Sequence, residues 1–159
     1  MYVYKEKDAV SSHITTIQNW EKIETNLIIE ALDFYTKKNN IKNNDAYIID
    51  IGANIGWYTL VFGKIGYNVL SFEPSNINYF ILKNNYCLNK EINTTLINKG
   101  LFTKEITCDL YAQFNNEGNG IAYCDKKYNI SNSFSIKIGE IKLTKLKNYI
   151  RFLSTKSLL

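Results

Sequence analysis

Two acidic residues and a glycine-containing loop are the strongest candidates for chemistry in this 159-residue chain. Asp50 and the loop 52–56, which reads Gly-Ala-Asn-Ile-Gly, follow one apolar run, and Glu73 ends the next. Glycine lets a ligand approach the backbone, because a Cβ atom would fill that space. A carboxylate at the end of the following strand can accept hydrogen bonds from both hydroxyls of a ribose. This spacing predicts a ligand that contains a nucleoside, although Glu73 alone would also suit a solvated strand end.

The loop differs from the glycine motifs that bind phosphate groups. It reads D-x-G-x-x-x-G and has neither the G-x-G-x-x-G of dinucleotide sites nor the G-x-x-x-x-G-K-[ST] of P-loops. A helix beginning near Gly56 would direct its free N–H groups at a carboxylate. Asp50 suits a ligand with a positive end, such as the sulfonium and ammonium of S-adenosylmethionine, and it can also stabilise the turn. We therefore expect S-adenosylmethionine as the cofactor.

Alternating helical and strand patterns surround these residues. Apolar residues recur at helical spacing or form short β-branched runs. The expected order is a helix over 24–37, a strand over 47–51, a helix over 57–64, a strand over 68–73, a helix over 77–88 and a strand over 92–98. Short connections between such units predict one wing of a doubly wound parallel sheet. The run 47–51 is apolar on both faces, as a strand buried inside a parallel sheet would be.

The pattern changes after Gly100. Short strands are expected over 105–112, 120–125, 133–138 and 141–146, with an Asn/Gly-rich turn over 115–120. This predicts an antiparallel hairpin excursion after the third parallel strand. We expect one domain over 1–159, with 1–15 loosely ordered, cofactor-binding βα units over 16–100, a β-rich extension over 101–146 and a tail over 147–159.

Two stretches carry a resemblance to a known family. Residues 49–60 read IDIGANIGWYTL, and residues 71–75 read SFEPS. The D-x-G-A-N-x-G-x-x-T pattern followed by F-E-P resembles the FkbM family of S-adenosylmethionine-dependent methyltransferases. Weaker matches lie at 83–89 and 96–101, and the resemblance covers about residues 20–150. It implies an α/β, Rossmann-like methyltransferase fold, a three-layer sandwich that is incomplete here.

The resemblance also implies roles for individual residues. Gly52, Ala53, Asn54 and Gly56 would line the methionine end of the cofactor, with Asp50 near its amino group and Thr59 near its carboxylate. Glu73 would hold the ribose, Pro74 and Ser75 would lie beside the adenine, and Asn98 and Lys99 would flank the base. For Thr59, Asn98 and Lys99, an ordinary structural role stays equally open. No catalytic base is assigned.

Members of this family usually methylate hydroxyl oxygens of sugars or other small acceptors. Their next segment contains a strand reading K-I-D-x-E-G, which this sequence lacks, and Lys147 stands where an Asp is expected. We therefore expect an O-methyltransferase if the chain is complete or complemented by a partner chain. The alternatives are an inactive or split cofactor-binding remnant without the acceptor half, and a nicotinamide-dependent oxidoreductase of Rossmann type.

The absent strand would normally lie beside 47–51. Without it, that apolar strand has an open edge that invites pairing. We expect a second copy of the chain or a partner chain to cover the edge, or the segment 149–153 to form a short substitute strand. An uncovered chain should oligomerise or bind its ligand weakly.

Composition narrows the remaining function classes. The formal net charge of +4 is small and scattered, which argues against nucleic acid as a partner. No apolar run is long enough to span a membrane, and no signal peptide pattern begins the chain, so a soluble cytoplasmic protein is expected. Cys87, Cys108 and Cys124 form no metal-binding or disulfide pattern, and free thiols are expected.

Overall fold

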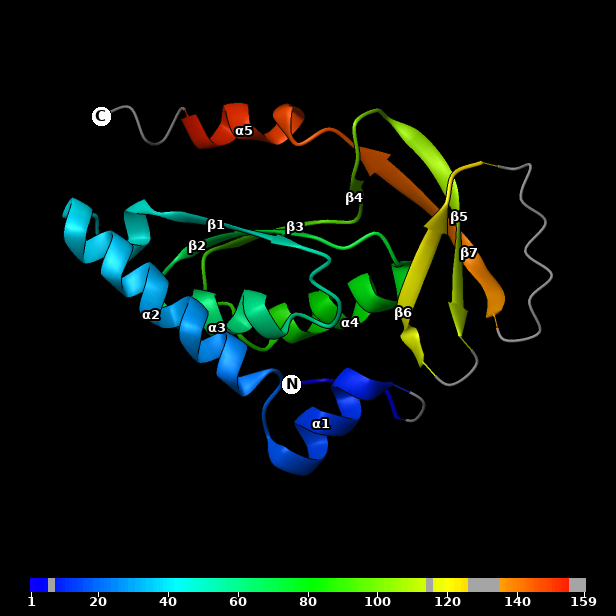
Figure 1. The fold of residues 1–159 in the computed structure, drawn as a ribbon, viewed down its shortest axis with the longest axis horizontal. Coiled ribbons are helices and arrows are strands. Elements are labelled where there is room, and N and C mark those ends of the chain that lie inside the picture. Colours follow the sequence, from blue (N-terminus) through cyan, green and yellow to red (C-terminus); the bar gives the residue numbers. More distant parts are fainter. Residues whose placement is uncertain (6–7, 114–115, 126–134, 155–159) are drawn as a thin grey trace.

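Three parallel strands form the first sheet (Figure 1). The computed structural model describes residues 1–5, 8–113, 116–125 and 135–154. Strands β1 (Tyr47–Ile51), β2 (Asn68–Phe72) and β3 (Thr94–Ile97) pair in the order β1-β2-β3, and the ends of all three lie in register, Ile51 beside Phe72 and Phe72 beside Ile97. The three expected strands are confirmed. Because the strands are parallel, the loops after β1 and β2 leave the sheet at the same edge.

Three helices lie on one side of this sheet (Figure 1). They are α2 (Lys22–Asn39), α3 (Trp57–Ile65) and α4 (Asn76–Cys87). Gly66 ends α3 in the left-handed conformation, and the Ser75 side chain caps α4. These helices agree with the expected ones. Parallel strands connected through helices make a mixed α/β arrangement that is compatible with a Rossmann-like fold.

The core between this sheet and its helices centres on β2. Phe62, Tyr67 and Val69 form a buried cluster against which side chains of α2 and β1 pack. All five residues of β2 are buried, whereas β1 is only partly buried and Ile51 is 64% exposed. The expectation that residues 47–51 form a strand buried on both faces is therefore wrong. The physical reason is position, since β1 is an edge strand of the described sheet and β2 is the central one.

The second sheet follows β3 and lies beside the first (Figure 1). Its strands are β4 (Gly100–Leu101), β5 (Ile106–Gln113), β6 (Asn116–Tyr123) and β7 (Ser135–Thr144), in the order β4-β7-β5-β6. Strand β5 pairs antiparallel with both β6 and β7, which confirms the antiparallel excursion. Residues 116–120 belong to β6 instead of a turn, and β7 is one strand where two were expected.

A disulfide joins β5 to the residue that directly follows β6. Cys108 and Cys124 have an S–S distance of 2.02 Å and a Cα–Cα distance of 4.3 Å. They lie directly opposite one another, next to the pair Asp109 and Tyr123. The expectation of free thiols is wrong for these two residues, because only the register of β5 and β6 brings them together. Closing a loop of this length stabilises a fold by about 3 kcal/mol in the chain-entropy model. Cys87 is free and exposed.

A helix lies near each end of the described chain, where the sequence shows no regular pattern. Helix α1 (Ala9–Ile17) begins after Asp8, whose Oδ2 accepts a hydrogen bond from the N–H of Ser11 at 2.7 Å. Helix α5 (Lys147–Ser154) lies on the side of the first sheet opposite α3 and α4 (Figure 1). The Tyr149 ring packs edge-on against Phe72, with 5.1 Å between centroids. Residues 149–153 are thus helical and form no substitute strand.

The outer edge of β1 pairs with no strand in the described residues. The short 3-10 helix η1 (Asn43–Asp45) precedes this strand. Within the described ranges, no helix combines the length and the apolar character that crossing a bilayer requires.

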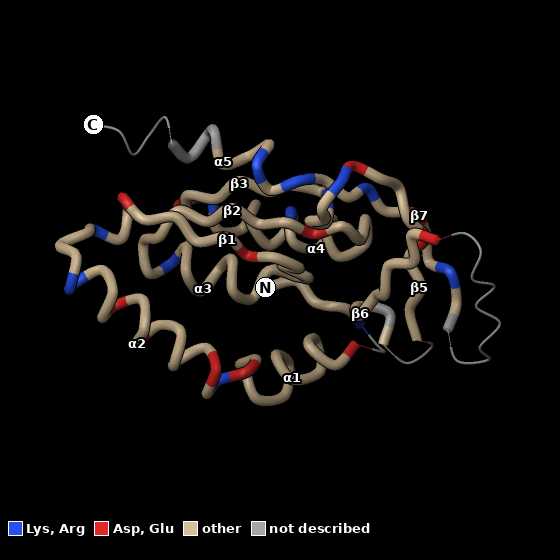
Figure 2. The backbone as a smooth tube through the Cα atoms, turned by 45° about the horizontal axis from the view of Figure 1, so that its top comes forward, with Lys and Arg blue, Asp and Glu red and all other residues tan. Residues whose placement is uncertain are grey.

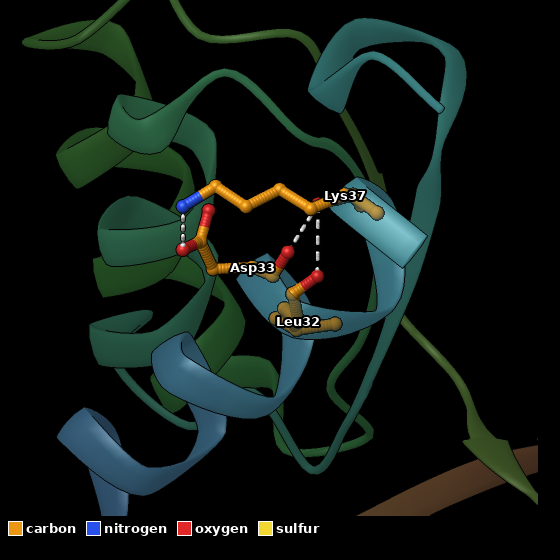
Figure 3. Close-up of polar contacts among 4 residues, drawn as sticks. Leu32, Asp33 and Lys37 are labelled. Atoms are coloured by element: carbon orange, nitrogen blue, oxygen red, sulfur yellow. Dashed lines mark hydrogen bonds and ion pairs between the residues drawn. The ribbon is translucent and has the colours of Figure 1, made fainter. Parts of the chain in front are cut away.

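The outer surface of α2 carries ordinary solvent-exposed pairs. Figure 3 shows Lys37 reaching back one helical turn to Asp33, with 2.5 Å between Nζ and Oδ2. Both side chains are mostly exposed, so the pair contributes at most about 0.5 kcal/mol to stability. Asp33 is therefore a suitable position for a charge-removing control.

Candidate functional site

The loop between β1 and α3 has an unusual backbone. Gly52, Asn54 and Gly56 all have positive φ, at 77°, 52° and 97°. The N–H groups of Gly52 and Ala53 both donate to the carbonyl of Phe72, at 2.9 and 3.0 Å, which ties the loop to the end of β2. A Cβ atom on Gly56 would lie 2.5 Å from Leu82 Cδ1, so glycine serves close packing there as well as conformation.

Glu73 directly contacts this loop. Its side chain is buried, and Oε2 accepts a hydrogen bond from the N–H of Asn54 at 2.7 Å. Oε1 accepts from the N–H of Ser75 at 2.8 Å and from Asn78 Nδ2 at 3.5 Å. The two parts of the site that the sequence singled out therefore meet, as expected from parallel strands that end at one edge.

Burial shifts the acid–base properties of both carboxyl groups. Desolvation raises the pKa of Glu73, and the negative charge of Asp50 raises it further, although three hydrogen bonds oppose the shift. Desolvation also raises the pKa of Asp50. Both groups therefore take up a proton at a higher pH than an exposed carboxyl group would.

Asp50 and Thr59 form a buried network with Ser71. Thr59 Oγ1 donates to Asp50 Oδ2 at 2.6 Å and lies 2.7 Å from Ser71 Oγ. The Thr59 side chain is fully buried, and neither Asp50 nor Thr59 lines either of the two cavities described below. This placement fits residues that hold β1, β2 and α3 together beneath the loop.

A cavity of about 160 Å³ opens beside Glu73. Its walls come from the loop, from the start of α4 and from the second sheet, which brings together segments distant in sequence. The lining includes Gly52, Asn54, Glu73, Pro74, Ser75, Asn78 and Gly118. Five of the predicted site residues thus surround one space, which we call the smaller cavity.

A second cavity, of about 300 Å³, lies at the same loop and shares Gly52 and Asn54 with the first. We call it the larger cavity. The rest of its wall comes from the N-terminal segment, from the residues just before α2, from the loop and the start of α3, and from β6. The lining includes Asp8, Trp20, Glu21, Ile55, Trp57 and Tyr58. The loop thus separates two adjoining spaces, one lined by Glu73 and the other by Asp8 and Glu21.

Two further predicted residues line neither of these cavities. Asn98 donates from its Nδ2 to the carbonyl of Glu73 at 3.2 Å, so it contacts the site only through the backbone. Lys99 lines a separate open cavity together with Glu105 and Lys142. Their different placement could not be predicted, because the two residues are adjacent in the sequence directly after β3.

Sequence reasoning missed several residues of the site, among them Asn78, Gly118 and Asp8. Asn78 is buried, and its Nδ2 donates to the carbonyl of Gly118 at 3.0 Å as well as to Glu73. Gly118 was assigned to a turn, and Asp8 to a loosely ordered end. A Cβ atom on Gly118 would lie 2.2 Å from Asp8 Oδ1, so this glycine permits the N-terminal segment to approach β6. A Ser-x-x-Asn spacing marks Asn78 as part of a helix cap, but nothing in the sequence places it beside Glu73.

Comparison with known proteins adds little to this geometry. No protein-family model matches the chain, and no curated protein matches it. Among solved structures, the 2.2 Å crystal structure of WbdD is similar, with 12% sequence identity and a TM-score of 0.48. The match covers 59% of this chain and 21% of the WbdD chain, so this chain spans much less than two thirds of that protein.

Proposed function

We propose that this chain binds S-adenosylmethionine and belongs to an FkbM-type methyltransferase that acts on a hydroxyl group of a sugar or other small acceptor. The observation that carries the proposal is the contact between Glu73 and the glycine loop at the wall of the smaller cavity. A buried carboxylate facing a space beside a glycine loop is suited to binding a ribose.

The residues present fit such a cofactor. Ionised Glu73 Oε2 accepts one hydrogen bond within the described chain, which leaves a lone pair for a ribose hydroxyl. Pro74 and Ser75 lie on the same wall and would contact the adenine. The larger cavity lies on the other side of the shared loop residues and would take the amino acid end. Its volume reaches the lower end of the range of about 300–1,000 Å³ that is typical of ligand sites.

The chemistry supplied by the bound cofactor is an electrophilic methyl group on a sulfonium. The acceptor oxygen would bond to this methyl carbon as the carbon–sulfur bond breaks, leaving S-adenosylhomocysteine, and the hydroxyl proton would pass to a base. The chain contributes binding and orientation of the reactants, which supply much of the acceleration in such a displacement. No residue of the described chain is assigned here as the base.

Two other functions can be distinguished from the proposed one by turnover and by ligand binding. A chain that binds the cofactor without catalysing transfer would share every binding property and lack turnover with a hydroxylated acceptor. A nicotinamide-dependent oxidoreductase would bind NAD, whose pyrophosphate is poorly suited to the acidic walls formed by Asp8 and Glu21.

Calorimetric titration of the chain with S-adenosylmethionine, S-adenosylhomocysteine and NAD tests the proposal. We expect the first two ligands to bind and NAD to give no heat of binding above the dilution control. Binding of NAD alone would support the oxidoreductase. If none of the three ligands binds, the proposed function is wrong.

Acidification is expected to weaken S-adenosylhomocysteine binding before it unfolds the chain. Because the pKa of Glu73 is raised from 4.5, its carboxylate takes up a proton and loses acceptor capacity as pH falls from neutrality toward that value. The same raised pKa means that the folded state binds protons first, so Glu73 and Asp50 add stability over this window on acidification. Affinity measured by titration calorimetry and stability measured by urea unfolding should therefore change in opposite directions. A dissociation constant that is independent of pH in this range would contradict ligand binding by the Glu73 carboxylate.

A further inference from the structure

The larger cavity has an acidic wall. The proposed function assigns no ligand contact to the acidic residues of this wall, which lie outside the loop. Asp8 and Glu21 both line it, and its described lining contains no Lys or Arg. Asp8 is the N-cap of α1 and Glu21 is the N-cap of α2, so the two residues bracket α1 in the sequence. Figure 2 shows acidic positions on both sides of this helix. This wall is suited to a cationic group of a ligand.

Asp8 has an unused acceptor atom. The side chain is 95% buried, since its relative exposure is 5%. Its Oδ2 caps α1, whereas Oδ1 has no hydrogen-bond partner among the described residues and packs against Gly118. A buried carboxylate oxygen without a donor costs free energy, and a ligand donor that reached Oδ1 would recover this cost.

Asn54, which lines the same cavity, provides a second acceptor without a partner among the described residues. Its Nδ2 donates to the carbonyl of Gly118 at 3.5 Å, and its Oδ1 is buried without a partner in the described chain. Asn54 and Asp8 both line the larger cavity and both contact Gly118. Two acceptors without donors match a group that carries several donors and no acceptor, such as a primary ammonium.

The N-terminal segment is held firmly enough to serve as a wall. Asn85 Nδ2 donates to the carbonyl of Tyr2 at 2.9 Å, and the Tyr4 hydroxyl donates to Asn78 Oδ1 at 2.5 Å. Asn85 is fully buried, and Asn78 also contacts Glu73. The segment that carries Asp8 is thus attached to the same helix, α4, that borders the smaller cavity.

We propose that Asp8, with the side-chain oxygen of Asn54, binds the ammonium group at the amino acid end of the adenosyl ligand. The inference rests on the proposed function and extends it, because it assigns a ligand-binding residue to the N-terminal segment, far from both sequence motifs. Glu73 and Asp8 then fix the two ends of one ligand from opposite sides of the loop.

The test compares two ligands on one conservative variant. S-adenosylhomocysteine carries the ammonium group, whereas 5′-methylthioadenosine lacks the whole amino acid part. Asp8→Asn keeps a good helix cap and removes the charge, because Asn and Asp cap about equally well. We expect it to weaken S-adenosylhomocysteine binding about tenfold and to leave methylthioadenosine binding unchanged. Asp33→Asn, which removes the same charge from the exposed surface of α2, should change neither affinity.

Each other outcome has a defined meaning. If the unaltered chain binds neither ligand, the proposed function itself fails. If it binds both, and Asp8→Asn weakens both equally or neither, the ammonium site is overturned while the adenosine site stands. Loss of methylthioadenosine binding together with a lower midpoint of urea unfolding would identify Asp8 as structural and would also overturn the inference.

Discussion

Replacing Glu73 with glutamine is expected to weaken S-adenosylhomocysteine binding about a hundredfold. The variant removes the charge from a carboxyl group that contacts the loop and lines the smaller cavity. Hydrogen bonds from ligand hydroxyls to a charged acceptor contribute about 1.5–3 kcal/mol, so losing them corresponds to one to two orders of magnitude in affinity. Titration calorimetry would measure the change directly. Glu91→Gln is the matched control, because Glu91 pairs with Lys64 on the exposed surface.

Glu73 also accepts hydrogen bonds from the backbone of Asn54 and Ser75, so part of any loss of affinity can be structural. A double-mutant cycle separates the two contributions. The 2′-deoxy analogue of S-adenosylhomocysteine should bind the unaltered chain more weakly than the parent ligand and should bind Glu73→Gln about as well as the parent does. If the losses of binding free energy from the substitution and from the missing 2′-hydroxyl are simply additive, Glu73 shapes the loop without contacting the ribose. The contact between Glu73 and the loop would then no longer support the proposal.

Replacing Phe72 with alanine is expected to lower the free energy of unfolding by about 3–5 kcal/mol. Phe72 is fully buried at the end of the central strand, and its ring packs against Tyr149 of α5. Truncation removes buried apolar surface and leaves a cavity in the layer between the sheet and α5. Urea unfolding followed by circular dichroism measures the change.

Phe80→Ala provides the comparison on α4, because that ring is 68% exposed. Its removal should change stability by no more than about 0.5 kcal/mol. Equal effects of the two substitutions would mean that β2 is not the centre of the core. The fold positions Glu73 immediately after Phe72, so such a result would also weaken the account of how the site is held in place.

Local sequence was sufficient for the three βα units and for the centre of the site. Helical spacing in residues 24–37 and the short β-branched runs predict elements from neighbouring residues alone, and the structure has all of them. The positive-φ loop at Gly52 and Gly56 was also readable, since glycine marks such conformations locally. Glu73 could be placed beside this loop because parallel strands in one sheet end at the same edge.

Only the tertiary structure decided which strand is central, which cysteines pair and which residues complete the site. Burial of β2 in place of β1 follows from strand order, and the disulfide between Cys108 and Cys124 follows from the register of β5 with β6. Asp8 can approach β6 because Gly118, remote in sequence, leaves space for its carboxylate. These features depend on pairing between distant segments, where the favourable contact appears only after the chain has closed a long loop. Spacing within a short window carries no information about such contacts.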